Sequence, residues 1–236
     1  MRLQFTARRS DSPWIDVVWT CVSDRVNEMT SVAGARCGLV FWEHDGRPHA
    51  AVSGPEPAAG TAPVPAGATF VGIEFAIGTS VRNLPTRTLV AGGVELPDTT
   101  RRSFRLAGSR WETPGPDDAE ALVDHLVRDG AIARDPIVSG VLRGGRPEVS
   151  ERTVERRFRA ATGLTRSAVR QIERARQAAH LLAAGKAATD VVASLDYFDQ
   201  PHLARALRRY IGRTATQLRE GTGGVLALDL PQPTTS

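Results

Sequence analysis

Arginine side chains that recur at a fixed interval are the groups in this sequence best suited to bind another molecule. Arg156 and Arg159 lie in the stretch VERRFRAATGLTRSAV, and Arg205 and Arg208 occupy the same places 49 residues later in LARALRRYIGRTATQL. A guanidinium stays positively charged and offers a planar fork of N–H donors. That fork can bond the O6 and N7 atoms of a guanine together, or it can hold a phosphate. The chemistry indicated is non-covalent recognition of an acceptor-rich, anionic molecule.

Each copy of the repeat has the pattern of an amphipathic helix with a defined beginning and end. Ser150 and Asp199 are typical N-caps, because their side chains can accept hydrogen bonds from the first free amides of a helix. Gly163 and Gly212 are typical left-handed stops. Apolar residues at helical spacing predict one buried stripe in each copy: Val154, Phe158 and Ala161 in the first, and Leu203, Leu207 and Tyr210 in the second. The arginines fall outside these stripes.

A shorter helix and a turn precede each copy, in DPIVSGVLRG and in ATDVVASL. A helix, a turn and a second helix with a basic outer face form the arrangement in which the second helix enters the major groove of DNA. Between the copies, residues 165–184 predict one longer helix with apolar residues on one side. Such a rod can hold two reading helices at the spacing of successive major grooves, about 34 Å. The repeat therefore predicts the two half-site readers of a dimer within one chain.

Several of these stretches resemble the DNA-binding domain of AraC/XylS-type transcription regulators. The resemblance covers roughly residues 117–220 and rests on GLTRSAVRQI, RARQAAHLLAAG, DVVASLDYFDQPHL and RALRRYIGRTATQLR. It implies an all-helical domain with two helix-turn-helix units joined by a linker helix, and double-stranded operator DNA as the partner. The strand-rich first half resembles the cupin-like sensor domains of such regulators. RNA polymerase, a small-molecule effector and a second copy in a homodimer are further partners that the resemblance allows.

The resemblance assigns roles to individual side chains. The positions that match base-facing sites of the family are Arg152, Glu155, Arg156, Gln200, Pro201, His202 and Arg205. The positions best suited to phosphate are Arg159, Arg208 and Arg209. Two alternatives stay open: each base-facing arginine can instead contact phosphate or simply be solvated, and Glu155 can instead pair with Arg152 or Arg159.

The sequence also departs from the family pattern, mostly in the second unit. Val192 stands where the family usually has alanine, Asp196 where it has glycine, and Pro201 where it often has a polar reader. Arg166 and Ala215 replace prolines that often follow the two stops. These departures predict that the second unit reads bases less strongly than the first.

The pattern as a whole predicts an α+β fold with two domains. Runs such as WIDVVWTCVS, CGLVFWEHDG, PHAAVSGPEP and ATFVGIEFAIG predict short antiparallel strands of a cupin-like sandwich or barrel in residues 1–111. Residues 54–67 are expected to form a loop rather than a strand, and residues 112–118 a linker in which Asp117 or Asp118 caps the next helix. Residues 119–221 form the predicted all-α DNA-binding domain, and residues 222–236 a flexible tail.

Charge supports a polyanionic partner for the second half. The net charge of the chain is +4, but residues 1–112 carry 12 Lys+Arg against 11 Asp+Glu, whereas residues 150–220 carry 14 against 7. Such a local excess is typical of nucleic-acid binding, although a merely solvated basic face has the same composition. The sequence has no apolar run of the length of a membrane span and no signal-peptide pattern at its start, so a cytoplasmic protein without a membrane partner is expected.

Other chemistry receives little support from the sequence. His44 and His49 are interpreted as surface residues around an Asp-Gly turn rather than as metal ligands, and Cys21 and Cys37 as core residues. Trp14, Trp19 and Trp42 can line a ligand pocket, but aromatic residues in strands are more often core. We therefore expect no enzyme, no catalytic residue, no cofactor and no metal. The alternative is a cupin-type enzyme fused to a DNA-binding domain.

Overall fold

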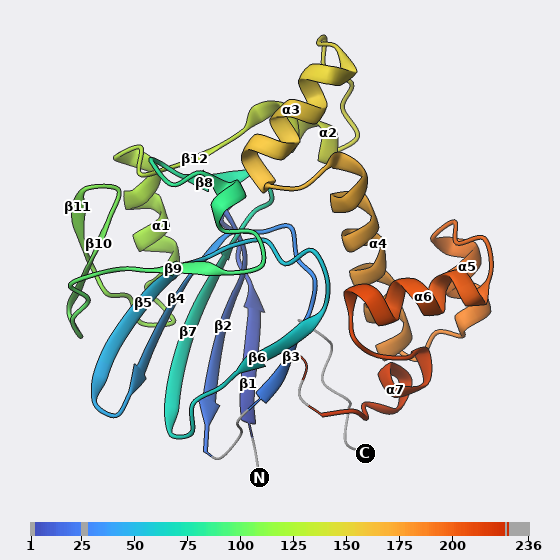
Figure 1. The fold of residues 1–236 in the computed structure, drawn as a ribbon, viewed down its shortest axis with the longest axis horizontal. Coiled ribbons are helices and arrows are strands. Elements are labelled where there is room, and N and C mark those ends of the chain that lie inside the picture. The colour runs from blue at the N-terminus through green and yellow to red at the C-terminus, as the bar shows by residue number, and fades with distance from the viewer. Residues whose placement is uncertain (1–2, 25–27, 225, 227–236) are drawn as a thin grey trace. The chain divides into compact units, whose positions relative to one another are not determined.

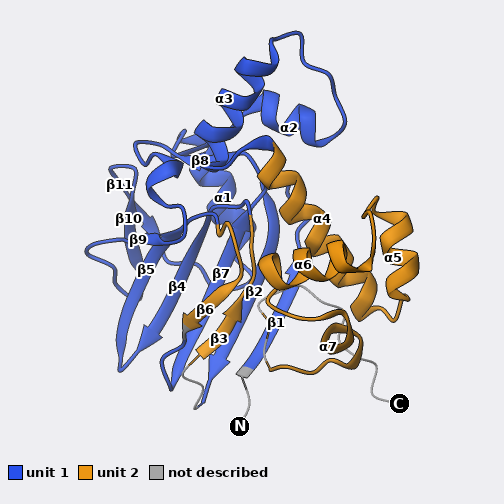
Figure 2. Cartoon of the chain, turned by 45° about the vertical axis from the view of Figure 1, so that its right-hand side comes forward, with its two compact units in different colours: residues 1–27, 35–55, 64–166 blue, residues 28–34, 56–63, 167–236 orange. Residues whose placement is uncertain are grey.

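The computed structural model describes residues 3–24, 28–224 and 226. The chain divides into two compact units (Figure 2). Unit 1 comprises residues 1–27, 35–55 and 64–166, and unit 2 comprises residues 28–34, 56–63 and 167–236. The predicted linker, residues 112–118, lies inside unit 1, and the division into a sensor domain and a DNA-binding domain stays a prediction.

Unit 1 is built on a six-stranded antiparallel sheet (Figure 1). All four runs that the sequence predicts as strands are confirmed, as β2, β4, β5 and β7. The strands follow one another across the sheet in the order β1 (Leu3–Arg9), β2 (Ile15–Ser23), β7 (Ala68–Phe75), β4 (Gly38–His44), β5 (Arg47–Ser53) and β9 (Gly93–Glu95). Among the described strands of this sheet, β1 and β9 are the two edges.

One face of this sheet carries the core of unit 1. Buried side chains of β4 and β7, such as Leu39, Phe41 and Phe75, belong to the same apolar cluster as Leu126 of α1 (Ala119–Arg128) and Phe104 of the hairpin β10 (Ser103–Leu106) and β11 (Ser109–Glu112). The rings of Phe41 and Phe104 meet edge to face with centroids 5.0 Å apart. Helix α1, expected in the DNA-binding domain, is thus part of the core of the sheet.

A short strand interrupts the region that the sequence predicts to be all helical. β12 (Ile132–Arg134) pairs antiparallel with β8 (Thr79–Val81), so the expectation of helix throughout residues 119–221 is wrong at these three residues. The partner of β12 lies about fifty residues earlier in the chain. The three residues of β12 do not predict this pairing by themselves, because whether a short segment forms a strand depends strongly on the strand it pairs with.

The segment expected to be a loop also contains a strand. β6 (Gly60–Pro63) pairs antiparallel with β3 (Glu28–Ser31), and this two-stranded ribbon belongs to unit 2. The prediction of a loop for residues 54–67 is therefore wrong at β6. Its proline- and alanine-rich sequence lacks the apolar alternation of a half-buried strand, and its ladder is formed with a distant segment.

The remaining helices of unit 1 are α2 (Pro136–Leu142) and α3 (Glu151–Thr162), which contact each other, and the single turn η1 (Thr86–Thr88). Helix α1 begins after Asp118, as expected, but the Asp118 side chain does not cap it. Its Oδ2 atom accepts a hydrogen bond from the backbone of Gly115 at 3.1 Å instead. The carboxylate therefore closes the preceding turn.

Unit 2 contains a long helix and the three shorter helices that follow it. The predicted long helix is confirmed as α4 (Arg166–Ala183), whose inward residues Val169, Ile172 and Leu182 are fully buried. It is followed by α5 (Ala188–Ser194), α6 (Gln200–Tyr210) and α7 (Ala215–Glu220). The predicted tail lies largely outside the described residues, which end at 224 except for 226.

Two glycines allow close approaches that fix the end of α3 in unit 1. Gly163 ends α3 in the left-handed conformation with φ of 68°, as predicted, and a Cβ at this position would collide with Val90. A Cβ on Gly54 would likewise collide with the Leu89 carbonyl. Because η1 contacts α3 and leads into Leu89, the segment after η1 is held between β5 and the end of α3.

An ion pair between β1 and α1 gives unit 1 a dependence on pH. Arg8 donates to both carboxylate oxygens of Glu120, at 2.6 and 2.8 Å, and the Ser10 hydroxyl donates to one of them at 2.7 Å. The hydrogen bonds from Arg8, with a smaller contribution from Ser10, lower the pKa of Glu120 from 4.5 to about 2. A depressed pKa means that the folded chain favours the ionised carboxylate.

We expect the stability of the Glu120→Gln variant to fall less steeply than that of the wild type as the pH is lowered. In the wild type this contribution is fully present above about pH 4.5 and is lost as the pH falls toward 2, because protonation then favours the unfolded chain. The effect is modest because the Arg8 side chain is 42% exposed and solvent screens the pair. Melting temperatures across this range, with the exposed Glu112→Gln as control, measure it. Parallel curves for wild type and Glu120→Gln would contradict the assignment.

Candidate nucleic-acid interface

The N-termini of α3 and α6 are fixed by the two predicted caps. The Ser150 hydroxyl accepts a hydrogen bond from the Thr153 amide at 3.2 Å. The Asp199 carboxylate accepts one from the His202 amide at 2.6 Å. In both helices the cap bonds the third helical residue, so the first turn is closed while its outer side stays accessible. The predicted buried stripes are confirmed, since Val154, Phe158, Leu203 and Leu207 are at most 2% exposed.

The outer face of α3 carries the first set of predicted contacts. Arg152 and Arg156 are exposed and have no hydrogen-bond or ion-pair partner among the described residues. Glu155 is half-buried: one carboxylate oxygen accepts from Arg159 Nε at 3.1 Å, and the other accepts from the backbone amide of Arg166 at 3.3 Å. Of the alternatives for Glu155, the pairing with Arg159 is thus present in the free chain, while Arg152 and Arg156 remain available to a ligand.

Asp135 connects α2 and α3, a role that was not predicted from the sequence. Its Oδ1 atom caps α2 by accepting from the amides of Ile137 and Val138 at 2.9 and 3.1 Å. Its Oδ2 atom lies 3.5 Å from Nη1 of Arg157 on α3. One carboxylate therefore caps the start of α2 and also contacts α3. The signal in the sequence is the Asp-Pro dipeptide, a typical helix start.

The outer face of α6 carries the second set. Gln200, Pro201 and Arg205 are exposed, and Arg205 has no polar partner within the described chain. His202 is half-buried, because its ring lies edge to face with the Tyr197 ring and its Nδ1 accepts from the backbone of Phe198 at 3.4 Å. Pro201 falls in the first turn, where a missing amide costs little. Arg208 and Arg209 are exposed further along the helix.

The turn between α5 and α6 accommodates the departure at Asp196. This residue has a positive φ of 54°, in the left-handed region that glycine adopts without cost. Arg174 of α4 points at the same turn: its Nη1 lies 3.5 Å from the Asp196 carbonyl, and its guanidinium lies 4.3 Å from the centre of the Tyr197 ring. Asp196 thus adopts the left-handed conformation in which the resemblance places a glycine.

The C-terminal end of α6 is held by groups from the first third of the chain. The amides of Ala33 and Ala59, which flank the β3–β6 ribbon, donate to the carbonyls of Tyr210 and Arg209 at 2.7 and 2.8 Å. The Tyr210 hydroxyl also donates to Gln171 of α4 at 2.7 Å. The last carbonyls of a helix have no partner within it, so the ribbon supplies donors where α6 ends. No pattern in the sequence indicated this support.

Comparison with known proteins gives a match for one part of the chain. Residues 146–221, which span α3 to α7, match a family model described as a helix-turn-helix domain. No curated protein and no solved structure matches the chain. The family match supports a DNA-binding transcription regulator of the AraC type, with double-stranded DNA as its partner. It covers no part of the sheet.

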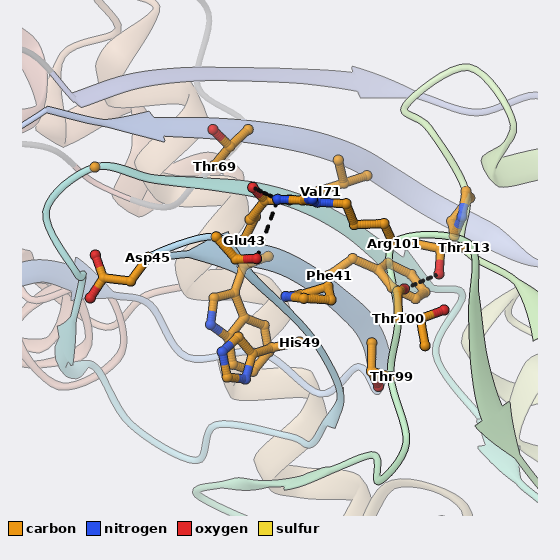
Figure 3. Close-up of a pocket in the computed structure, with 15 residues that line it drawn as sticks. Phe41, Glu43, Asp45, His49, Thr69, Val71, Thr99, Thr100, Arg101 and Thr113 are labelled. Atoms are coloured by element: carbon orange, nitrogen blue, oxygen red, sulfur yellow. Dashed lines mark hydrogen bonds and ion pairs between the residues drawn. The ribbon is translucent and has the colours of Figure 1, made fainter.

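A second candidate site lies on the sheet of unit 1 (Figure 3). This pocket has a volume of about 550 Å³ and is lined by Phe41 of β4, Thr69 and Val71 of β7, and the segment 99–101. Arg101 and Glu43 also line it and form an ion pair, in which Nε and Nη2 of Arg101 donate to the two Glu43 oxygens at 2.8 and 2.9 Å. The lining combines apolar surface with hydroxyl groups and one ion pair, which suits a small polar molecule with an apolar part.

The other residues with candidate chemistry have structural partners. Cys21 and Cys37 are buried free thiols, as expected, and burial raises the pKa of both, that of Cys37 to about 11. His49 stacks on Trp42 with centroids 4.9 Å apart and lies 2.6 Å from Glu95 Oε1. Within the described part of the chain, none of the helices has both the length and the apolar character needed to cross a bilayer.

We expect Arg156→Ala and Arg208→Ala to weaken DNA binding in different ways. Arg156→Ala should cost about 1–3 kcal/mol on the specific site and relax the preference at one base pair, because a bidentate base contact is lost. Arg208→Ala should weaken binding to all sequences and reduce the salt dependence by about one phosphate contact. Titrations of specific and random DNA at several salt concentrations separate the two. Arg110→Ala, an exposed arginine of β11, removes the same charge as a control. Equal losses on both DNAs for Arg156→Ala would refute base reading.

Proposed function

We propose that this protein is a transcription regulator that reads two successive major grooves of an operator, with α3 in one groove and α6 in the next. In this proposal α2–α3 and α5–α6 are helix-turn-helix units, and α4 is the helix that links them. The observation that carries it is the shared design of α3 and α6. Each has a capped N-terminus, a buried stripe, and an unpaired exposed arginine at the same place, Arg156 and Arg205.

The proposed contacts divide into base and phosphate contacts. We assign base edges to Arg152, Arg156, Gln200, His202 and Arg205, since they lie in the first two turns, the part of a recognition helix that meets bases. Pro201 can offer only an apolar contact. Glu155 can accept from cytosine only after it releases Arg159, to which it is hydrogen-bonded in the free chain. Arg159, Arg208 and Arg209 are assigned to phosphate.

We further propose that the first half is a cupin-like sensor domain and that the pocket beside Arg101 takes a small-molecule effector. The support is chemical: threonine hydroxyls and the Arg101–Glu43 pair offer polar partners beside Phe41 and Val71. The alternative, a cupin-type enzyme fused to a DNA-binding domain, draws no support from the family match. Metal analysis and turnover assays on the purified protein would test that alternative.

One chain should protect two major-groove segments about 34 Å apart, one turn of the double helix. The measurement is methylation-protection footprinting of the full chain on the sequence recovered by binding-site selection. Arg156→Ala should weaken protection in one segment and Arg205→Ala in the other, because the two arginines occupy equivalent places on α3 and α6. A single short protected segment per chain would refute the two-groove proposal and would mean that α6 does not read bases.

Filling the pocket should abolish an effector response without abolishing DNA binding. Thr69 is an exposed residue of β7 that lines the pocket, so Thr69→Trp should occupy the space with little strain on the core. Compounds that raise the melting temperature of the wild type should fail to do so with this variant, and should no longer change its operator affinity. If the variant responds as the wild type does, the effector site lies elsewhere.

A further inference from the structure

Two of the few large apolar side chains exposed on the described chain occupy equivalent places in the internal repeat. The exposed set is Val22, Val94, Leu142, Val149 and Phe198. Val149 and Phe198 are separated by 49 residues, the same interval that relates Arg156 to Arg205. Each directly precedes an N-cap, Ser150 or Asp199. In both α3 and α6, the residue directly before the N-cap is therefore an apolar side chain exposed to solvent.

Phe198 is the extreme case, with 90% of its surface exposed. A residue before an N-cap often packs on the fourth residue of the helix, which here is Leu203. Leu203 is only 1% exposed although the Phe198 side chain points into solvent. The neighbouring Tyr197 is 5% exposed, so it is Tyr197 and not Phe198 that is buried. The Phe198 side chain is thus not needed for the packing of α6. Leaving a phenylalanine in water forgoes roughly 1.5–3 kcal/mol of burial.

The charges on the helix that follows Phe198 indicate what covers it. Helix α6 carries Arg205, Arg208 and Arg209 on its exposed positions and no acidic residue between Gln200 and Tyr210. The acidic residues that flank Phe198 are Asp196 in the turn and Asp199, whose carboxylate is taken up by the cap of α6. Arg174 lies beside the same turn. An apolar protein surface would have to desolvate these guanidinium groups, whereas DNA supplies phosphates for them. The major groove also offers one apolar feature, the C5-methyl group of thymine, which pairs well with phenylalanine.

Val149 holds the equivalent place before α3, where Glu148 and Glu151 are acidic and Glu151 pairs with Arg166 at 3.0 Å. The Val149 side chain is 42% exposed, and it is followed by the cap at Ser150 and the exposed, unpaired Arg152 and Arg156. A branched aliphatic side chain can make the same contact with a thymine methyl as Phe198, over a smaller area. The two residues differ in size, so the contact at α6 is expected to be the stronger one.

We propose that Phe198 and Val149 are thymine-reading residues that each bury an apolar side chain against the methyl group of a thymine at the N-terminus of a recognition helix. This inference rests on the proposed function, because it requires α6 and α3 to enter major grooves. It adds an apolar element to a specificity otherwise carried by arginine and polar side chains. It also gives α6 a means of reading sequence that does not depend on the position occupied by Pro201.

The test removes single methyl groups from the DNA and single side chains from the full-length protein. Each thymine of the selected operator is replaced in turn by deoxyuridine, which lacks only the C5-methyl. One such replacement should weaken wild-type binding about fourfold, the equivalent of one buried methyl group, and should not weaken Phe198→Ala further. A deoxyuridine replacement at a different thymine should weaken wild-type binding without weakening the binding of Val149→Ala further. Val94→Ala, the same change at a 39% exposed residue of β9, is the matched control.

The variants should keep the wild-type melting temperature, since the side chains removed are exposed. If Phe198→Ala and Val149→Ala bind the operator as Val94→Ala does, the inference is overturned while DNA binding stands. If every deoxyuridine replacement weakens the binding of the two variants as much as it weakens that of the wild type, the inference is also overturned. The same holds if the variants bind DNA with wild-type affinity but lose the transcriptional response, because that result indicates a protein partner. If the wild-type chain binds no DNA at all, the proposed function itself fails and the inference with it.

Discussion

The hydrogen bonds that close the first turns of α3 and α6 are the interactions on which the proposed interface depends. A helix end exposes amides without partners, and an uncapped first turn frays. The proposed base-facing residues all lie in the first two turns, where fraying would displace their side chains from the positions needed to contact bases. Ser150 and Asp199 close these turns from outside the helix, so that no reading side chain is used for the purpose. The caps thus hold the first turns without using the exposed side chains of either helix.

The two helices are supported at their other ends by different means, although their sequences are repeats. Helix α3 ends at Gly163 beside Val90, within the same compact unit as the six-stranded sheet. Helix α6 ends where Ala33 and Ala59 donate to its last carbonyls, beside a ribbon whose strands come from the first third of the chain. Each of the two helices is therefore packed together with part of the N-terminal sequence.

Local features of the fold were predictable from the sequence, and non-local ones were not. Caps, apolar stripes and glycine stops are determined within a few residues, so α3, α4 and α6 were expected within one residue of their ends. The strands β3, β6 and β12 consist of three or four residues each, and they exist because distant segments pair with them. The same holds at the interface. Exposed arginines were predictable from periodicity, whereas the Asp135–Arg157 contact and the exposure of Phe198 depend on how helices pack.

The departures from the family pattern in the second unit need not disable it. Asp196 adopts the left-handed conformation that the family's glycine provides, and Arg174 approaches its carbonyl. A non-glycine residue pays roughly 1 kcal/mol for that conformation, and the contacts of Arg174 with the turn and with Tyr197 can offset a cost of this size. Pro201 loses no hydrogen bond in the first turn, and its rigid ring pre-forms the helix there. In the proposed interface, Pro201 removes one polar contact to a base, and the exposed Phe198 next to the cap of α6 is suited to replace it by an apolar contact.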